Sequence, residues 1–173
     1  DNVPYFYQYS NTMYPGRTCQ NTSIAMLLAY FGWNGVPDDI TSYWGKDYAQ
    51  SPSGLADVFN SEASWNGMGA RLVPETNGTL AGLRSELDAG NPTIVHGYFT
   101  SYGHVMVVIG YDSGGYYVND PAGRWSGSFG GGYPYGWNST VGEGIYYPKA
   151  AFEAAIATWD GYSPAPLWYH KLR

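Results

Sequence analysis

The chain has 173 residues, of which 44% are hydrophobic and 13% are charged, and its net charge at pH 7 is −6. This length suits one domain with an apolar core, and the single cysteine excludes an internal disulfide. Lysine and arginine form no cluster and no apolar run approaches the roughly 20 residues of a membrane helix, so we expect neither nucleic acid nor a membrane as a partner.

The first predicted helix covers residues 18–32 and carries the only cysteine. Thr18 is a suitable N-cap residue and Gly32 a suitable stop. Apolar side chains at i, i+3, i+4 and i+7 predict one buried face, made of Ile24, Leu27, Leu28 and Phe31. Cys19 then lies in the first turn, where unpaired N–H groups and the helix dipole favour a thiolate. Alternatively, Cys19 is a small core side chain, as lone cysteines often are.

The rest of the first half is also mainly helical. A second helix is predicted to begin at Asp38 or Asp39, and this acidic pair would otherwise supply half of a cation site. Two further helices are expected at residues 51–63 and 79–90, because leucine and other apolar residues recur there with helical spacing. A short strand is expected between them at residues 69–74.

The second half of the sequence changes to the β-branched runs that are typical of strands. Three strands are expected in succession, at residues 92–99, 103–111 and 115–120. Because the loops between them have hairpin length, neighbouring strands must be antiparallel. The chain closes with three further segments: a loop rich in Gly, Tyr and Trp at 121–147, a helix at 148–157 and an extended segment at 167–171. An ordered loop of this length is more often functional than not.

Helices followed by a meander of strands are typical of the α+β class. We therefore predict a single domain over residues 1–173. Its mainly helical half, residues 1–91, packs with the helix of Cys19 on the antiparallel sheet of residues 92–173.

A base for the cysteine is expected at His104, which begins the strongest predicted strand. Asp120 ends the next strand, and the turn near residue 112 lies midway between them, so antiparallel pairing brings the two side chains together. An imidazole beside a carboxylate holds one tautomer and keeps its other nitrogen for a thiolate. Cys19, His104 and Asp120 thus form a candidate catalytic triad.

Several motifs together resemble the C39-like cysteine peptidases of the papain-like superfamily. The similarity covers residues 3–121, about two-thirds of the chain. The motifs are Val3-Pro-Tyr, Gln8, Thr18-Cys-Gln-Asn-Thr-Ser-Ile-Ala-Met-Leu-Leu-Ala-Tyr-Phe-Gly32, Leu87-Asp-Ala-Gly-Asn-Pro92, Gly103-His-Val, Gly110-Tyr-Asp112 and Asn119-Asp-Pro121. Many relatives have Cys-Gly-Pro where this chain has Cys-Gln-Asn.

The resemblance implies a papain-like fold and a thiol protease that needs no cofactor or metal. It also implies that Cys19 is the nucleophile, His104 the general base and acid, Asp120 the orienting carboxylate, and Gln8 a donor to the oxyanion. We expect a stand-alone form without a transporter domain. The low share of charge and the start at Asp1 further favour a secreted bacterial protein.

The substrate stays open at this level. A peptide bond is the first expectation, and the same triad would also suit a peptidoglycan amidase or endopeptidase, or an acyltransferase. A different class is a non-catalytic module that binds carbohydrate by stacking sugar rings on Trp125, Tyr133, Tyr135 and Trp137. A metal site has little basis, because three scattered histidines and one cysteine lack ligand spacing.

Overall fold

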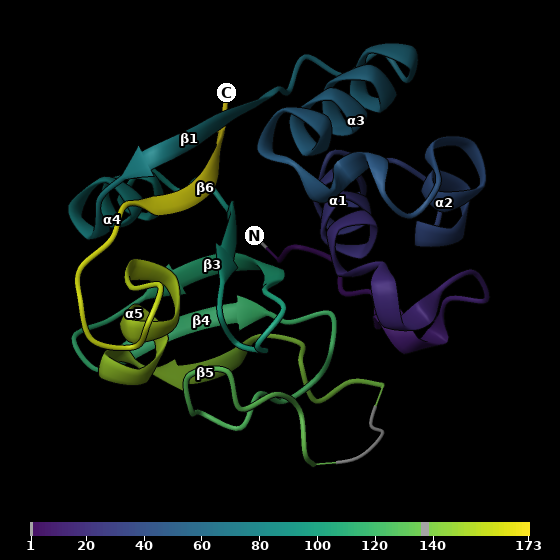
Figure 1. Ribbon diagram of the computed structural model, residues 1–173. Helices are drawn as coiled ribbons and strands as arrows, with labels where there is room; N and C mark the ends of the chain where they lie inside the picture. Colours follow the sequence, from purple (N-terminus) through teal and green to yellow (C-terminus); the bar gives the residue numbers. More distant parts are fainter. Residues whose placement is uncertain (1, 136–138) are drawn as a thin grey trace.

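A computed structural model describes residues 2–135 and 139–173 of the chain (Figure 1). In this part of the chain, six strands form one antiparallel sheet in the order β1-β6-β2-β3-β4-β5. The strands are β1 (Leu72–Gly78), β2 (Thr93–Gly97), β3 (His104–Tyr111), β4 (Gly115–Asn119), β5 (Ile145–Pro148) and β6 (Leu167–Leu172). The predicted meander is therefore the β2-β3-β4 part of a wider sheet.

Helices cover both faces of this sheet (Figure 1). They are α1 (Cys19–Tyr30), α2 (Pro37–Trp44), α3 (Pro52–Trp65), α4 (Leu80–Asp88) and α5 (Lys149–Ala157), with short 3-10 turns at Gln8–Ser10, Pro15–Arg17 and Tyr48–Gln50. Strand β3 alternates between the two layers: Val105 and Val107 belong to the core with α1 and α3, whereas Met106 and Val108 belong to the core with α4 and α5. The α+β class is confirmed.

Two strand boundaries differ from those expected. β1 begins at Leu72 and continues to Gly78, beyond the predicted 69–74, because Leu72 to Glu75 pair with β6 at the far end of the sequence. β5 occupies the end of the segment that was expected to be loop to residue 147. In both cases distant pairing decides where the strand lies, and local sequence carries little signal for it.

The burial predicted for Ile24, Leu27 and Leu28 in α1 is confirmed, but burial is not confined to their face of the helix. Residues 20–28 are all buried, because α1 packs against β3, α2 and α3 at once. Phe31, expected on the apolar face, follows the last helical residue and is 39% exposed. Polar residues in the helix have partners in the core: Asn21 Nδ2 donates to Thr41 Oγ1 at 2.9 Å.

Side-chain caps occur at the starts of three helices, and one of these, at the start of α2, was expected at Asp38 or Asp39. Ser51 and Thr79 accept from backbone N–H groups at the starts of α3 and α4, and Asp39 accepts from the Val36 N–H at the start of α2. Asp38 instead accepts from the backbone of residues 12 and 13. Both carboxylates of the suggested cation pair thus have protein partners.

Thr18 occupies the N-cap position of α1 but its side chain does not cap the helix. Its hydroxyl donates to the Tyr14 carbonyl oxygen and accepts from Asn11 Nδ2, both at 3.0 Å. The N–H groups of the first turn around Cys19 therefore stay free of a side-chain cap. Within the described residues, no helix is both long enough and apolar enough to cross a membrane.

Candidate active site

The single cysteine lies at the first position of α1, as predicted, and is half-buried. Its thiol donates to Gln20 Oε1 at 3.4 Å. The Gln20 amide is itself fixed, because Nε2 donates to the carbonyl oxygens of Arg17 (3.0 Å) and Lys46 (2.7 Å). Cys19 therefore stands at the positive end of a helix dipole, next to a side chain that is held in place.

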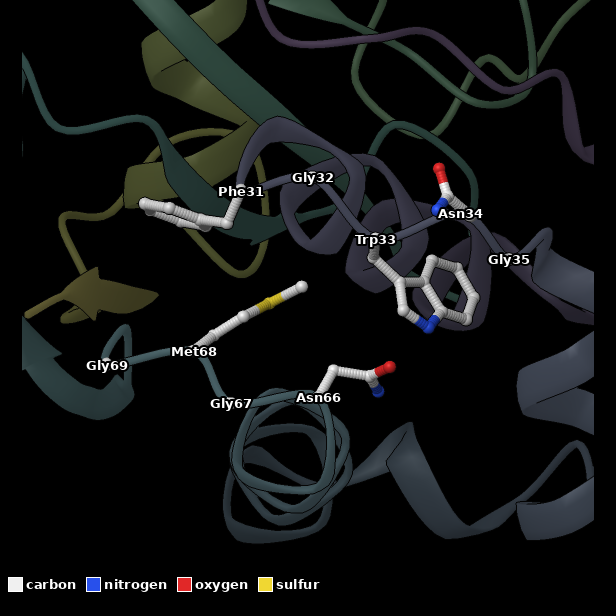
Figure 2. Close-up of a pocket in the computed structure, with 9 residues that line it drawn as sticks. All are labelled: Phe31, Gly32, Trp33, Asn34, Gly35, Asn66, Gly67, Met68 and Gly69. Atoms are coloured by element: carbon white, nitrogen blue, oxygen red, sulfur yellow. The ribbon is translucent and has the colours of Figure 1, made fainter.

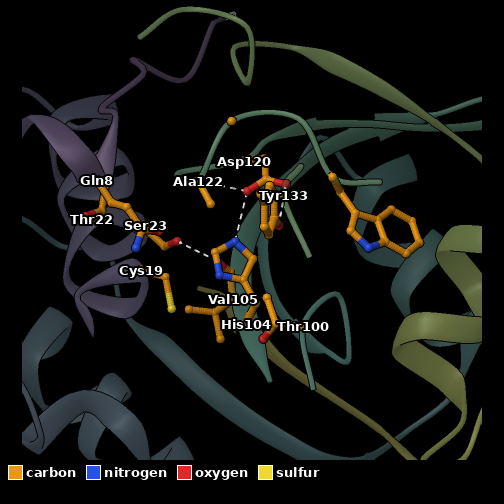
Figure 3. Close-up of polar contacts among 12 residues, drawn as sticks. Gln8, Cys19, Thr22, Ser23, Thr100, His104, Val105, Asp120, Ala122 and Tyr133 are labelled. Atoms are coloured by element: carbon orange, nitrogen blue, oxygen red, sulfur yellow. Dashed lines mark hydrogen bonds and ion pairs between the residues drawn. The ribbon is translucent and has the colours of Figure 1, made fainter. Parts of the chain in front are cut away.

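The His104 imidazole lies between Cys19 and Asp120 (Figure 3). Its Nε2 is 2.9 Å from Asp120 Oδ1, and the rest of the ring faces Cys19. The two residues are not directly opposite in the hairpin: Val107 pairs with Asn119, and a bulge later in the hairpin shifts the register. The carboxylate reaches the ring diagonally, from the residue that follows the end of β4.

The charges of Cys19, His104 and Asp120 alter the pKa values of the thiol and the imidazole. Burial raises the pKa of the Cys19 thiol, but the charge of His104 and hydrogen bonds from His104, Val105 and Gln20 outweigh burial, so that this pKa lies below its ordinary value. Burial lowers the pKa of His104, but the negative charges of Cys19 and Asp120 raise it to about 10. Both changes in pKa favour a thiolate and imidazolium pair over the neutral thiol and imidazole.

Asp120 is fully buried, and four donors surround its carboxylate. Oδ1 accepts from the backbone N–H of Ala122 at 3.1 Å, besides its contact with His104. Oδ2 accepts from the hydroxyls of Tyr133 (2.8 Å) and Tyr147 (2.6 Å). These four hydrogen bonds stabilise the buried negative charge and fix the orientation of the carboxylate.

Neither tyrosine was predicted as a partner of Asp120, and Tyr133 was named only as part of a possible carbohydrate platform. Burial and then the charge of Asp120 raise the pKa of both hydroxyls above the ordinary value, so they stay protonated and donate. The Tyr147 hydroxyl also accepts from the buried backbone N–H of Trp125 at 2.9 Å. The Tyr133 ring packs on the His104 ring, with centroids 5.2 Å apart. The one available signal was their position near the 121–147 loop that was expected to be functional.

Gln8 lies in the first 3-10 turn and is buried close to the start of α1 (Figure 3). Its Nε2 donates to the Pro15 carbonyl oxygen at 2.9 Å, and its Oε1 has no hydrogen-bond partner among the residues that the structure describes. Its backbone N–H donates to the Pro121 carbonyl oxygen at 2.8 Å, which ties this turn to the residue after Asp120. Pro15 takes one of the two amide hydrogens, and Gln8 is not among the residues that line the cavity beside Cys19.

A cavity of about 490 Å³ opens beside Cys19 and His104. Its other lining residues are Gly16, Arg17, Gln20, Ala49, Gln50, Ser51, Pro52, Leu55, His96, Tyr102, Gly103, Val105, Trp168 and His170. A cavity of this size accommodates a small ligand or a few residues of an extended peptide.

A second pocket, of about 590 Å³, lies between the segments 31–35 and 66–69 (Figure 2). It is at the opposite end of α1 from the cysteine, about 18 Å away at 1.5 Å per helical residue. Trp33, Asn66 and Met68 point into it. This pocket is too far from the thiol to take part in its chemistry.

The three described members of the aromatic platform suggested for carbohydrate do not form a common exposed surface. Trp125 is 2% exposed and belongs to the core, and the Tyr133 hydroxyl is bound to Asp120. Tyr135 is 55% exposed, with the Arg124 guanidinium over its ring at 4.3 Å. Trp137, the fourth member, lies outside the described residues.

Comparisons with known proteins point to one family. The family model described as Peptidase_C39 like family matches residues 1–155. No match was found among curated proteins.

Solved structures share the fold at low sequence identity. A C39-like peptidase from Bacillus anthracis is 17% identical with a TM-score of 0.64, over 98% of this chain and 94% of that one. A double glycine motif protease from an AMS/PCAT transporter, in complex with its leader peptide, is 15% identical with a TM-score of 0.57, over 98% and 90%. The peptidase domain of Streptococcus ComA, a bifunctional ABC transporter, is 15% identical with a TM-score of 0.60, over 91% of each chain.

Proposed function

Since the chain belongs to the Peptidase_C39 like family of cysteine peptidases, we propose that Cys19, His104 and Asp120 are its catalytic triad and hydrolyse a peptide amide bond through a thioester. The observation that carries the proposal is the imidazole placed between the only thiol and a buried carboxylate, with Nε2 2.9 Å from Asp120 Oδ1. The chain has one cysteine, so it offers no other thiol nucleophile.

The reaction begins with attack of the Cys19 thiolate on the carbonyl carbon of the scissile amide. Electrons of the C=O bond move to oxygen, and the resulting oxyanion accepts from the Cys19 backbone N–H and from the second hydrogen of Gln8 Nε2. The imidazolium of His104 gives its proton to the leaving nitrogen as the C–N bond breaks. An amine departs and the acyl group stays on sulfur as a thioester.

Water completes the cycle. His104, now neutral, takes a proton from a water molecule as its oxygen attacks the thioester carbonyl carbon. The second tetrahedral intermediate expels the thiolate, releases a carboxylic acid and restores the imidazolium. Asp120 accepts from the ring throughout, which fixes its orientation and stabilises its positive charge.

Thiol alkylation tests the nucleophile directly. Iodoacetamide should modify Cys19 with an apparent pKa below the ordinary thiol value of about 8.5, and the same reagent should abolish cleavage of a peptide library. The matched control is Cys19→Ser, which should be unreactive and inactive. A thiol that is unreactive at neutral pH in the folded protein would rule out the proposed mechanism.

The substrate pool decides between the two hydrolytic roles. A peptidase should cut soluble peptides and leave purified cell walls intact, whereas a peptidoglycan amidase or endopeptidase should solubilise the walls. We propose the peptidase role and an extracellular bacterial location. The small share of charged residues, 13%, supports that location.

A further inference from the structure

The cavity beside the thiol has an unbalanced charge. Among its lining residues, all of which the structure describes, Arg17 is the only Lys or Arg and none is Asp or Glu. This contrasts with the chain as a whole, which has a net charge of −6. His104 is paired with both Cys19 and the Asp120 carboxylate, so Arg17 is the one lining charge that is left to pair with a ligand.

Two further histidines line the cavity, and both are neutral at pH 7. Burial and then the charge of His104 lower the pKa of His96 to about 4. Burial also lowers the pKa of His170. Because a carbonyl oxygen only accepts, the 2.8 Å contact of His170 Nε2 with the Pro52 carbonyl oxygen places the ring proton on Nε2. Neither imidazole therefore adds a positive charge to the cavity beside that of Arg17.

Arg17 has no ion pair with any residue that the structure describes. The nearby Lys46, in contrast, is 2.9 Å from Asp47 and lies over the Tyr14 ring. The Arg17 backbone is held, since its N–H donates to the Tyr14 carbonyl oxygen at 2.9 Å and its carbonyl oxygen accepts from Gln20. A fixed backbone thus presents an exposed guanidinium two residues before the nucleophile.

The remaining lining side chains are mostly apolar. Ala49, Pro52 and Leu55 come from the short turn before α3 and from its first turns, and Trp168 comes from β6. The His96 ring packs edge-on against Trp168 with centroids 4.6 Å apart. An apolar group placed here loses water without leaving a polar group unpaired.

Resting on the proposed function, we propose that the substrate is an acidic peptide: a carboxylate within a few residues of the scissile amide pairs with Arg17, and an apolar side chain fills the cavity against Leu55 and Trp168. A guanidinium binds a carboxylate in a bidentate way and so orients it as well as attracting it. The carboxylate can belong to an Asp or Glu side chain or to the C-terminus of the peptide.

A paired set of quenched fluorescent peptides tests this. Each pair differs by Glu against Gln at one position, scanned over the positions on both sides of the cleaved bond, and a further pair differs by a free or an amidated C-terminus. At one position, or at the C-terminus, the acidic member should have about a two- to fivefold higher kcat/KM at low ionic strength, and the preference should shrink in salt. Equal kcat/KM in every pair would overturn the inference while leaving the peptidase activity intact.

Variants assign the preference to Arg17. Arg17→Gln should remove it, Arg17→Lys should retain part of it, and Arg17→Glu should favour a Lys-containing peptide. Lys149→Gln removes the same charge from an exposed position on α5 that does not line the cavity, and it should keep the wild-type preference. A preference that survives in Arg17→Gln would refute the role of Arg17.

A binding measurement separates this inference from catalysis. In Cys19→Ala, quenching of tryptophan fluorescence should report tighter binding of the acidic peptide than of its neutral partner. If the wild type cleaves nothing and Cys19→Ala still discriminates, the proposed function fails and the charge preference stands. If Cys19→Ala binds both peptides equally, or neither, the charge preference fails.

Discussion

Replacing Tyr147 by Phe removes the hydroxyl that donates to the carboxylate of the candidate triad. Tyr147 is 3% exposed, its hydroxyl donates to Asp120 Oδ2 at 2.6 Å, and it accepts from the Trp125 N–H at 2.9 Å. A hydrogen bond to a charged group contributes about 1.5 to 3 kcal/mol, and an N–H left buried without a partner costs about 1 to 3 kcal/mol. We expect Tyr147→Phe to lower the free energy of unfolding by about 3 to 5 kcal/mol.

Two other tyrosines provide the comparison. Tyr133 donates to the same oxygen at 2.8 Å, so Tyr133→Phe should cost less, about 1.5 to 3 kcal/mol. Tyr146 is 39% exposed and donates to Asp112 at 2.7 Å at the surface, so Tyr146→Phe should cost at most about 0.5 kcal/mol. Urea unfolding followed by tryptophan fluorescence measures all three. If Tyr147→Phe lowers the free energy of unfolding no more than Tyr146→Phe does, the buried hydrogen bonds to Asp120 do not stabilise the fold.

Three further predictions concern the chemistry. His104→Ala should raise the thiol pKa relative to the wild type, as measured by the pH dependence of alkylation, because the charge and hydrogen bond of His104 are lost while burial remains. The stability that protonated His104 adds is complete below pH 6.5 and is lost as the pH rises towards about 10, so the variant should lack this alkaline loss. Gln8→Ala should reduce kcat by roughly 10²–10³-fold and leave the alkylation rate within about twofold, since an oxyanion donor acts only on the transition state; an unchanged kcat would remove Gln8 from the mechanism. Gly103→Ala should reduce both kcat and Tm, because φ at Gly103 is +89° and an added Cβ would lie 2.7 Å from His96 Nε2. The control is Gly69→Ala, which should be nearly neutral because no atom lies within 4 Å of a Cβ added there.

The sequence carried the parts of the site that depend on local patterns. Cys19 at a helix start follows from the apolar run behind it, and the approach of His104 to Asp120 follows from antiparallel pairing of two strands joined by a short turn. The α+β class followed from the change of period along the chain. The turn is centred between residues 113 and 114 rather than at 112, and the bulge, which was not predictable, shifts the register by one residue so that Val107 pairs with Asn119.

The parts that were missed depend on contacts between distant segments. Tyr133 and Tyr147 reach Asp120 only because the intervening chain folds back over β4, and no local pattern records that path. The burial of α1 on all sides was missed for a similar reason, since Asn21 and Ser23 look solvent-facing in sequence and find partners at Thr41 and in the backbone of β3. Amphipathic spacing therefore does not predict the burial of a helix that carries polar residues and is enclosed by other elements.

The N-terminal segment is joined to the residues around Asp120 by backbone and side-chain hydrogen bonds. Tyr5 donates to the Asp120 carbonyl oxygen at 2.7 Å, and Asn119 Nδ2 donates to the Val3 carbonyl oxygen at 2.9 Å. These bonds tie the start of the chain to the end of β4, next to β3. His104 and Val105, which lower the pKa of the thiol, reach Cys19 only when β3 has packed against α1. Before that contact forms, the sulfur lacks the charge of His104, so we expect alkylation at mildly acidic pH to report folded molecules.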